Sequence, residues 1–353
     1  MVQRIGKSFL IMVASQLLLL LLLLANGSAY TYLQSRKHPF VVSTKSRQGG
    51  SSLIRTSAVN TASEELFNGM RAQSDSKKFV AMLKSAVRRR DFVLSASDKT
   101  LLIAEINFRH NQLDFSSLTE CLSLLGKMGI RNDDKALPSL ITDVMDTLAS
   151  ISPLQSTSSG SRETVNGVTG ISMTRLLNAL VRNGGSWGDL PLSARELLLS
   201  RIRTSVFNDP ASTALLPDVA WSLGKLRAEL RSLDPAFLSD LMTAISGIGE
   251  RPAQSSKQSS QSFDVAKLLY GLSQMKTRWV SDVSDPAKSA MIALLGQQSD
   301  CMNENGIVNS VYSLGKMECP WMSLSENTQR SILLNVERVS SVMGAPALAN
   351  TLW

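Results

Sequence analysis

Cationic side chains recur at a fixed place in a repeating pattern between residue 117 and the end of the chain. Each stands two residues after a leucine, near the expected end of a helix. Such a column along one face of a protein could contact successive phosphates of a nucleic acid. Favourable placement of cations at helix C-termini explains the same column, and the sequence leaves both interpretations open. The column consists of Lys127, Arg182, Lys225, Gln274 and Lys316, in which the neutral Gln274 is the one exception to the positive charge.

A second column is polar throughout but changes its chemistry from copy to copy. In a modular RNA-binding protein a few side chains of each repeat read one base, so a base-facing column varies in this way. A solvent-facing position that is free to drift gives the same mixture. The acidic members favour that alternative, because carboxylates are unusual base contacts. The column consists of Glu120, Arg175, Asp218, Lys267, Asn309 and Asn350.

The sequence offers little for catalysis. Two histidines, His38 and His110, stand apart from any partner motif, and a lone histidine is more often a packing or surface residue than a base. Cys121, Cys301 and Cys319 lack the paired spacing of a zinc site. No nucleophile, phosphate-loop or metalloprotease motif occurs. The sequence therefore predicts no enzyme, no cofactor and no metal site.

Both columns belong to an internal repeat. The copies align around one leucine, and a position two residues before it becomes aromatic in the later copies. Along that position the copies recur at intervals of 55, 43, 49, 42 and 41 residues. The leucine column is Leu125, Leu180, Leu223, Leu272 and Leu314, and the partly aromatic column is Ser123, Asn178, Trp221, Tyr270, Tyr312 and Trp353.

A tryptophan column confirms the register of the repeat. Seven residues after the leucine stand Trp187, Leu230, Trp279 and Trp321, and only the first copy departs, with Asn132. These rings could stack on bases. A packing wedge in the turn between two helices is the favoured interpretation, because the position in the repeat is fixed.

Each copy has the apolar spacing of two helices joined by a turn. The sequence predicts an all-α fold, an α-solenoid of helix-hairpin repeats of about 40 residues. We expect five copies and a truncated sixth over 117–353, preceded by an N-terminal helical cap over 64–116. Two stretches rich in Ser, Gly, Pro and Gln, 150–170 and 251–262, are expected to be flexible insertions between copies.

The N-terminus has the pattern of a two-part address. Residues 1–29 combine early basic residues with an apolar run and small residues before Tyr30, which predicts a secretory signal peptide. A membrane anchor fits less well, because the run is shorter than the about 20 residues that span a bilayer. No stable membrane insertion is therefore expected after signal cleavage.

The next segment, 30–63, contains no acid and is rich in Ser and basic residues, which is typical of a transit peptide. The two segments together predict delivery to a plastid inside the endomembrane system; a mitochondrion or the secretory pathway are the alternatives. The odd number of cysteines argues against an ordinary secreted protein.

The address accounts for most of the net charge. The chain carries +8, but the first 63 residues hold seven of the 37 basic residues and none of the 29 acids. The rest is close to neutral, so a polyanionic partner must be argued from local charge. One local cluster is Lys77, Lys78, Lys84, Arg88, Arg89 and Arg90. It offers further phosphate contacts, or it is a solvated helix face.

The repeat also carries a family resemblance. "LANTLW" (348–353) and "SLGKM" (313–317) followed by Trp321 resemble the "ANTLWALGKMG" repeats of algal organelle proteins. Such proteins are related to the octotricopeptide-type chloroplast translation and RNA-stability factors and to the FAST-kinase/RAP family. The resemblance covers about residues 117–353, is best in the last two copies, and includes no RAP domain.

The resemblance implies binding of organellar single-stranded RNA, with a role in transcript processing, stability or translation. Other proteins of an RNA-processing or translation complex are further expected partners. The alternative is a non-catalytic scaffold for protein–protein interaction in the organelle. Because the chain ends in register within a sixth copy, we also expect the sequence to be a fragment.

Overall fold

Side-chain caps and apolar spacing set where the helices begin. Asp114 accepts a hydrogen bond from the backbone N–H of Ser117, and Asp264 accepts one from that of Lys267. These caps satisfy amides that no helix carbonyl reaches, and each stabilises its helix by about 1 kcal/mol. Apolar side chains at helical spacing follow and give each helix one buried face.

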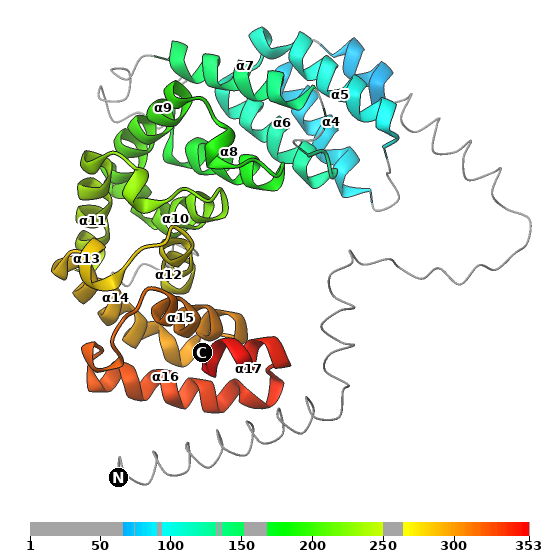
Figure 1. Cartoon of the computed structure of the whole chain (residues 1–353). Helices are drawn as coiled ribbons and strands as arrows, with labels where there is room; N and C mark the ends of the chain where they lie inside the picture. Colours follow the sequence, from blue (N-terminus) through cyan, green and yellow to red (C-terminus); the bar gives the residue numbers. More distant parts are fainter. Residues whose placement is uncertain are drawn as a thin grey trace, which may run out of the picture. The chain divides into compact units, whose positions relative to one another are not determined.

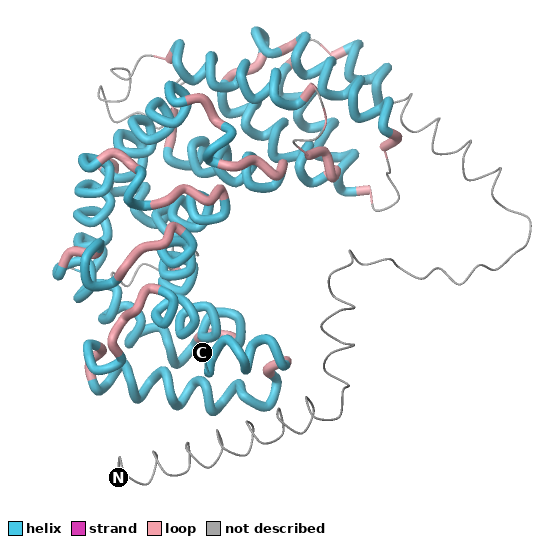
Figure 2. Tube along the Cα trace, viewed as in Figure 1, coloured by secondary structure: helices cyan, strands magenta, loops and turns pink. Residues whose placement is uncertain are grey.

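The computed structural model describes residues 66–73, 75–89, 94–131, 134, 136–151, 168–249 and 264–352. Helices are the regular structure throughout these ranges, which contain no strand, and the predicted all-α fold is confirmed (Figure 2). The expected signal and transit segments, Trp353 and most of the two insertions lie outside them. None of the helices in these ranges combines the length and apolar character needed to cross a membrane.

The helices alternate between two rows (Figure 1). The first-helix row consists of α4 (Ser76–Arg88), α6 (Phe115–Lys127), α8 (Gly170–Arg182), α10 (Leu216–Lys225), α12 (Val265–Gln274), α15 (Glu304–Lys316) and α17 (Ala345–Leu352). The second-helix row consists of α5 (Ala96–Phe108), α7 (Leu137–Ser150), α9 (Leu192–Ile202), α11 (Pro235–Gly249), α14 (Asp285–Gln298) and α16 (Glu326–Val339).

Short helical turns connect the two rows and extend the second helices. The connecting turns are η3 (Trp187–Asp189), η6 (Leu230–Ser232), α13 (Trp279–Asp282) and η8 (Trp321–Ser323). The turns after second helices are η1 (His110–Gln112), the π-helical η4 (Arg203–Phe207), η7 (Ser299–Cys301) and η9 (Ser340–Val342), and η5 (Pro210–Leu215) leads into α10.

Contacts between neighbours run along both rows. Each first helix contacts the next, from α4 through α6, α8, α10, α12 and α15 to α17. In the second-helix row α5 contacts α7, η4 at the end of α9 contacts α11, and α11, α14 and α16 follow in series. A buried guanidinium links α7 to α9: Arg201 donates to the carbonyl oxygens of Leu148 and Ile151 at the end of α7.

The N-terminal helices take the same places in the rows as a repeat copy. α4 contacts α6, and α5 contacts α7. Within the expected N-terminal helical cap, the sequence alone indicates one helix over 75–95 and a second over 99–113. In the structure α4 ends at Arg88, whereas α5 begins at Ala96 because Ser95 and Asp98 form a capping box in front of it.

Every first helix of the five copies ends in the same backbone motif. The carbonyl oxygen of the repeat leucine accepts a hydrogen bond from the amide five residues later, for example Leu125 from Ile130 and Leu314 from Cys319. The residue before each of these amides lies in the left-handed region, which makes this a Schellman motif. These residues are Gly129, Gly184, Arg227, Lys276 and Glu318.

The tryptophan column joins one copy to the next. The amides of Trp187, Leu230 and Trp279 donate to carbonyl oxygens just past the ends of α10, α12 and α15, at Leu226, Met275 and Met317. The side chains of Trp187 and Trp279 are 4% and 2% exposed, so the packing interpretation fits both. Trp321, whose turn has no further complete hairpin beside it among the described residues, is 40% exposed.

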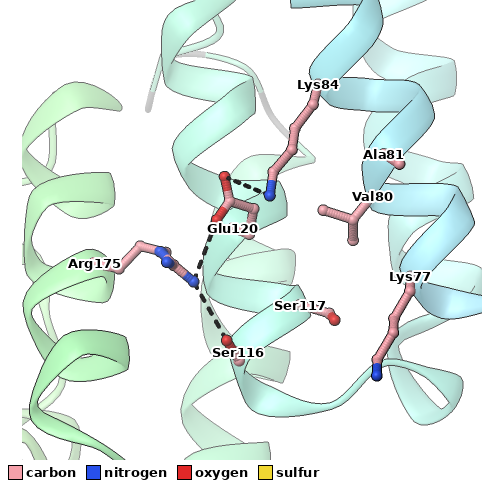
Figure 3. Close-up of a pocket in the computed structure, with 8 residues that line it drawn as sticks. All are labelled: Lys77, Val80, Ala81, Lys84, Ser116, Ser117, Glu120 and Arg175. Carbon is pink, nitrogen blue, oxygen red and sulfur yellow. Dashed lines mark hydrogen bonds and ion pairs between the residues drawn. The ribbon is translucent and has the colours of Figure 1, made fainter.

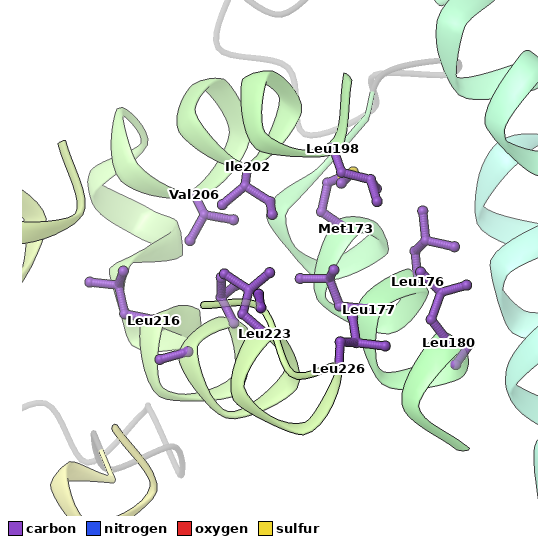
Figure 4. Close-up of a cluster of buried hydrophobic side chains, with 14 of the residues drawn as sticks. Met173, Leu176, Leu177, Leu180, Leu198, Ile202, Val206, Leu216, Leu223 and Leu226 are labelled. Atoms are coloured by element: carbon purple, nitrogen blue, oxygen red, sulfur yellow. The ribbon is translucent and has the colours of Figure 1, made fainter. Parts of the chain in front are cut away.

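Leucines fill the space between the rows. Leu177 and Leu180 of α8 and Leu198 of α9 meet Leu223 of α10 in one apolar cluster, and all four are almost fully buried (Figure 4). A buried leucine stabilises a fold by roughly 1.5–3 kcal/mol relative to an exposed one. Because the cluster draws on three helices of two copies, burial holds neighbouring copies together.

Candidate nucleic-acid interface

The variable, partly aromatic and basic columns share one face of the first helices from α6 to α15. Their members stand at positions i, i+3 and i+7 of a helix, as Asp218, Trp221 and Lys225 do on α10, and such positions lie above one another. The leucine column lies on the buried side. Stacking of the first helices brings the columns together in one surface, which we call the row face.

Lysines and aromatic rings alternate on the row face from α10 to α15. The ammonium of Lys225 lies 5.0 Å from the ring centre of Tyr270 and 5.8 Å from that of Trp221. It also donates to the Tyr270 hydroxyl at 3.1 Å. Lys267 lies 5.5 Å from the Trp221 ring, and Lys316 lies 5.9 Å from the Tyr312 ring.

Two of these contacts cross from one copy to the next, and the other two join residues of the same helix. Lys225 on α10 reaches Tyr270 on α12, and Lys267 on α12 reaches back to Trp221 on α10. All three rings are partly exposed. We call Trp221, Tyr270, Tyr312, Lys225, Lys267 and Lys316 the lysine–aromatic ladder. A ladder of this kind offers ring faces to bases and ammonium groups to phosphates.

The basic column lies where the sequence placed it, near the helix ends. Each of its five members is the last residue of its first helix. Lys127, Arg182 and Lys225 are exposed, and Arg182 donates weakly, at 3.4 Å, to the hydroxyl of Ser123 on the neighbouring helix. This position suits both earlier interpretations, the phosphate contact and the helix C-terminus, so the assignment to RNA phosphates stays a prediction.

The variable column contains ion pairs between neighbouring copies. Arg175 of α8 lies 3.2 Å from Glu120 of α6, and Lys267 of α12 pairs with Asp218 of α10. Acidic and basic members therefore alternate because they contact each other. Asn309 is partly buried and Asn350 exposed. A role in reading bases stays a prediction; the four charged members already have partners within the row.

Among the described residues, the histidine and cysteine side chains do not come together in a site. His110 places Nδ1 2.6 Å from the carbonyl oxygen of Asn107 on its own helix end. Cys121 is fully buried, and burial raises the pKa of its thiol to about 12. Within the described residues no group of His, Cys, Asp and Glu side chains is arranged to hold a metal ion.

The ladder was not predicted from the sequence, although the sequence contains a signal for part of it. Trp221 is followed four residues later by Lys225, and Tyr312 by Lys316, which places each pair on adjacent turns of one helix. Lys267 contacts a ring 46 positions away, and only the stacking of α12 on α10 reveals that contact.

The sequence of this chain matches no protein-family model and no curated protein.

Proposed function

We propose that this chain is a non-catalytic RNA-binding protein and that its helices form an α-solenoid of hairpin repeats of about 40 residues. A single strand lies along the row face, with bases on the ladder rings and phosphates near the basic column. The two rows of contacting helices support the solenoid, because each hairpin buries its apolar side against its neighbours.

The ladder is the observation that carries RNA binding. Every base has a π-face, so partly exposed aromatic rings bind single strands with little sequence preference, at about 1–3 kcal/mol per stacked base. Lysine ammonium groups lie over the rings, 5.0–5.9 Å from the ring centres, and add positive charge at this surface. The charge of the chain beyond residue 63 is nearly balanced. Electrostatic attraction for RNA must therefore come from local positive charge, such as the ladder lysines.

The place of action belongs to the same proposal. Residues 1–29 and 30–63 direct the chain to a plastid, where it contributes to the processing, stability or translation of particular transcripts. The composition of the two segments supports this destination. A reporter fused to residues 1–63 tests it, and accumulation of the reporter in the secretory pathway would contradict it.

Ring removal tests RNA binding. We expect Trp221→Ala and Tyr270→Ala each to weaken binding of a single-stranded organellar RNA by about 1–3 kcal/mol. Phe108→Ala is the matched control, because Phe108 is an aromatic residue of the second-helix row that is 76% exposed. Fluorescence anisotropy with purified protein measures all three affinities. Equal affinities for the ladder variants and the control would refute the proposed interface.

A protein scaffold is the second candidate function, and exposed apolar side chains favour it. Phe108, Leu192, Val280, Met322 and Val342 are at least 63% exposed, and none of them belongs to the first-helix row. Exposed apolar side chains mark protein-binding surfaces where they gather into a contiguous patch. If charge reversal at Lys127, Lys225 and Lys316 leaves RNA binding intact but removes co-purifying proteins, the scaffold is the better account.

A further inference from the structure

A pocket opens on the row face between α4, α6 and α8, apart from the ladder. It has a volume of about 200 Å³ and is lined by Lys77, Val80, Ala81, Lys84, Ser116, Ser117, Glu120 and Arg175 (Figure 3). Three cations and one carboxylate give the lining a net charge of +2. Water occupies about 30 Å³ per molecule in the liquid, so the volume admits a tetrahedral anion with some of its hydration.

Glu120 holds two of the cations in place at the pocket. Its carboxylate lies 3.7 Å from the ammonium of Lys84 and 3.2 Å from the guanidinium of Arg175, so it joins α4 to α8 through α6 (Figure 3). Arg175 also donates to the hydroxyl of Ser116 at 3.3 Å. Two cations that share one carboxylate keep a net positive charge and retain N–H groups that can donate to a further acceptor.

Lys77 supplies the third cation. Its side chain is exposed at the pocket, and among the described residues no carboxylate forms an ion pair with it within 4.0 Å. The hydroxyl groups of Ser116 and Ser117 add neutral donors to the lining. The first turn of α6 is already capped by Asp114, so the positive character of the pocket comes from the side chains.

We propose that this pocket binds a phosphate group. Cations from two helices together with hydroxyl donors suit the several oxygen acceptors of a tetrahedral phosphate. A carboxylate ligand suits the pocket less well, because the planar fork of Arg175 already faces Glu120. The phosphate comes from the backbone or end of a bound RNA strand or from a free phosphorylated compound. The site itself does not depend on RNA binding.

Calorimetric titration of the purified chain with inorganic phosphate at low ionic strength tests the pocket. We expect Lys77→Gln/Lys84→Gln to weaken phosphate binding at least tenfold. The matched control is Lys78→Gln/Arg88→Gln, which removes two charges from the same helix outside the pocket lining and should stay within twofold of the wild type. Lys77→Gln alone breaks no ion pair and should weaken phosphate binding about threefold. This single variant tests the pocket if the double variant unfolds.

The titration also separates the two sources of phosphate. Saturation with a single-stranded RNA abolishes the phosphate signal if the strand fills the pocket and leaves it unchanged if the ligand is a free compound. Absence of phosphate binding by the wild type, or equal loss in both double variants, would overturn the site. If the chain binds no RNA, the proposed function fails, yet the phosphate titration still decides the pocket.

Discussion

At the scale of single residues, the left-handed position after each first helix is a point of local strain. It is Gly129 and Gly184 in the first two copies but Arg227, Lys276 and Glu318 in the later ones, with φ near +60°. An L-residue in this region costs roughly 1–2 kcal/mol, whereas glycine costs little. The later copies therefore keep the Schellman motif against the preference of their own residue.

Substitution at this position should change stability in opposite directions. We expect Arg227→Gly to stabilise the fold by about 0.5–1 kcal/mol, because relief of strain exceeds the entropy that glycine adds to the unfolded chain. Gly184→Ala should destabilise it by about 1 kcal/mol through φ alone, since an added Cβ meets nothing within 4 Å. Urea denaturation measures both. Stabilisation by Gly184→Ala would contradict the motif.

The thiols should differ sharply in reactivity. Cys121 is fully buried and its pKa is raised to about 12, whereas Cys301 is exposed. At pH 8 a thiol reagent should modify Cys301 quickly in the folded chain and Cys121 only after unfolding, because the thiolate is the reactive form. Mass spectrometry of labelled peptides measures this, and the urea-unfolded chain is the control. Similar rates for both thiols in the folded chain would disprove the burial.

The raised pKa of the Cys121 thiol also determines how the stability of the fold changes with pH. An unfolded thiol titrates near pH 8.5, so the folded chain binds the Cys121 proton more tightly. The resulting stability is fully present below about pH 8.5 and is lost as the pH rises toward 12. The loss approaches about 1.4 kcal/mol per pH unit. The stability difference between the wild type and Cys121→Ala should therefore shrink above pH 9.

At the scale of helices, α10 and α12 pack unusually closely where the ladder begins. A Cβ on Gly271 would lie 2.5 Å from the carbonyl oxygen of Ala220 and 2.5 Å from the amide nitrogen of Trp221. These are backbone atoms that cannot move alone. The small residue at this position therefore sets the distance between the two helices that carry Trp221 and Tyr270.

Gly271→Ala should force α10 and α12 apart. We expect it to lower the free energy of unfolding by about 1–3 kcal/mol, as overpacking in a core does. Gly247→Ala in α11 is the matched control: an added Cβ meets nothing within 4 Å there, and alanine favours the helix by about 1 kcal/mol. Thermal denaturation compares the two. Equal effects of both substitutions would contradict the close packing.

Helix type and order could be predicted from the sequence because they depend on local signals. Apolar spacing and the tryptophan column gave the hairpins from α6 to α16, and the all-α fold followed. Contacts between copies could not be predicted. Glu120 and Arg175 are 55 positions apart, and their pairing depends on how α8 stacks on α6. The same stacking explains why the variable column contains ion pairs.

At the scale of the whole molecule, the charge balance constrains how RNA would bind. Beyond residue 63 the chain has 30 basic and 29 acidic residues, so no long-range field attracts a polyanion to this part. Several acids are paired inside the row face, as Asp218 is with Lys267. On the row face, the positive charge that remains includes Lys77 at the pocket and the four cations of the basic column at the ends of the first helices.

Salt dependence therefore measures how many phosphates the basic column contacts. Lys127, Arg182, Lys225 and Lys316 provide four cations, and a single strand contributes a slope of about −0.7 per phosphate in a plot of log affinity against log salt. We expect the column to account for a slope of about −3. Lys225→Gln and Lys316→Gln should each reduce its magnitude by about 0.7.

The control is Arg330→Gln, which removes an exposed charge from α16 in the second-helix row. It leaves the basic N-terminal segment of the chain intact, as the column variants do, so non-specific attraction cancels in the comparison. If Arg330→Gln changes the slope as much as Lys225→Gln, the cations act through general charge. A change confined to the column variants indicates that the phosphates lie along the first-helix row, where Lys225 and Lys316 also contact the ladder rings.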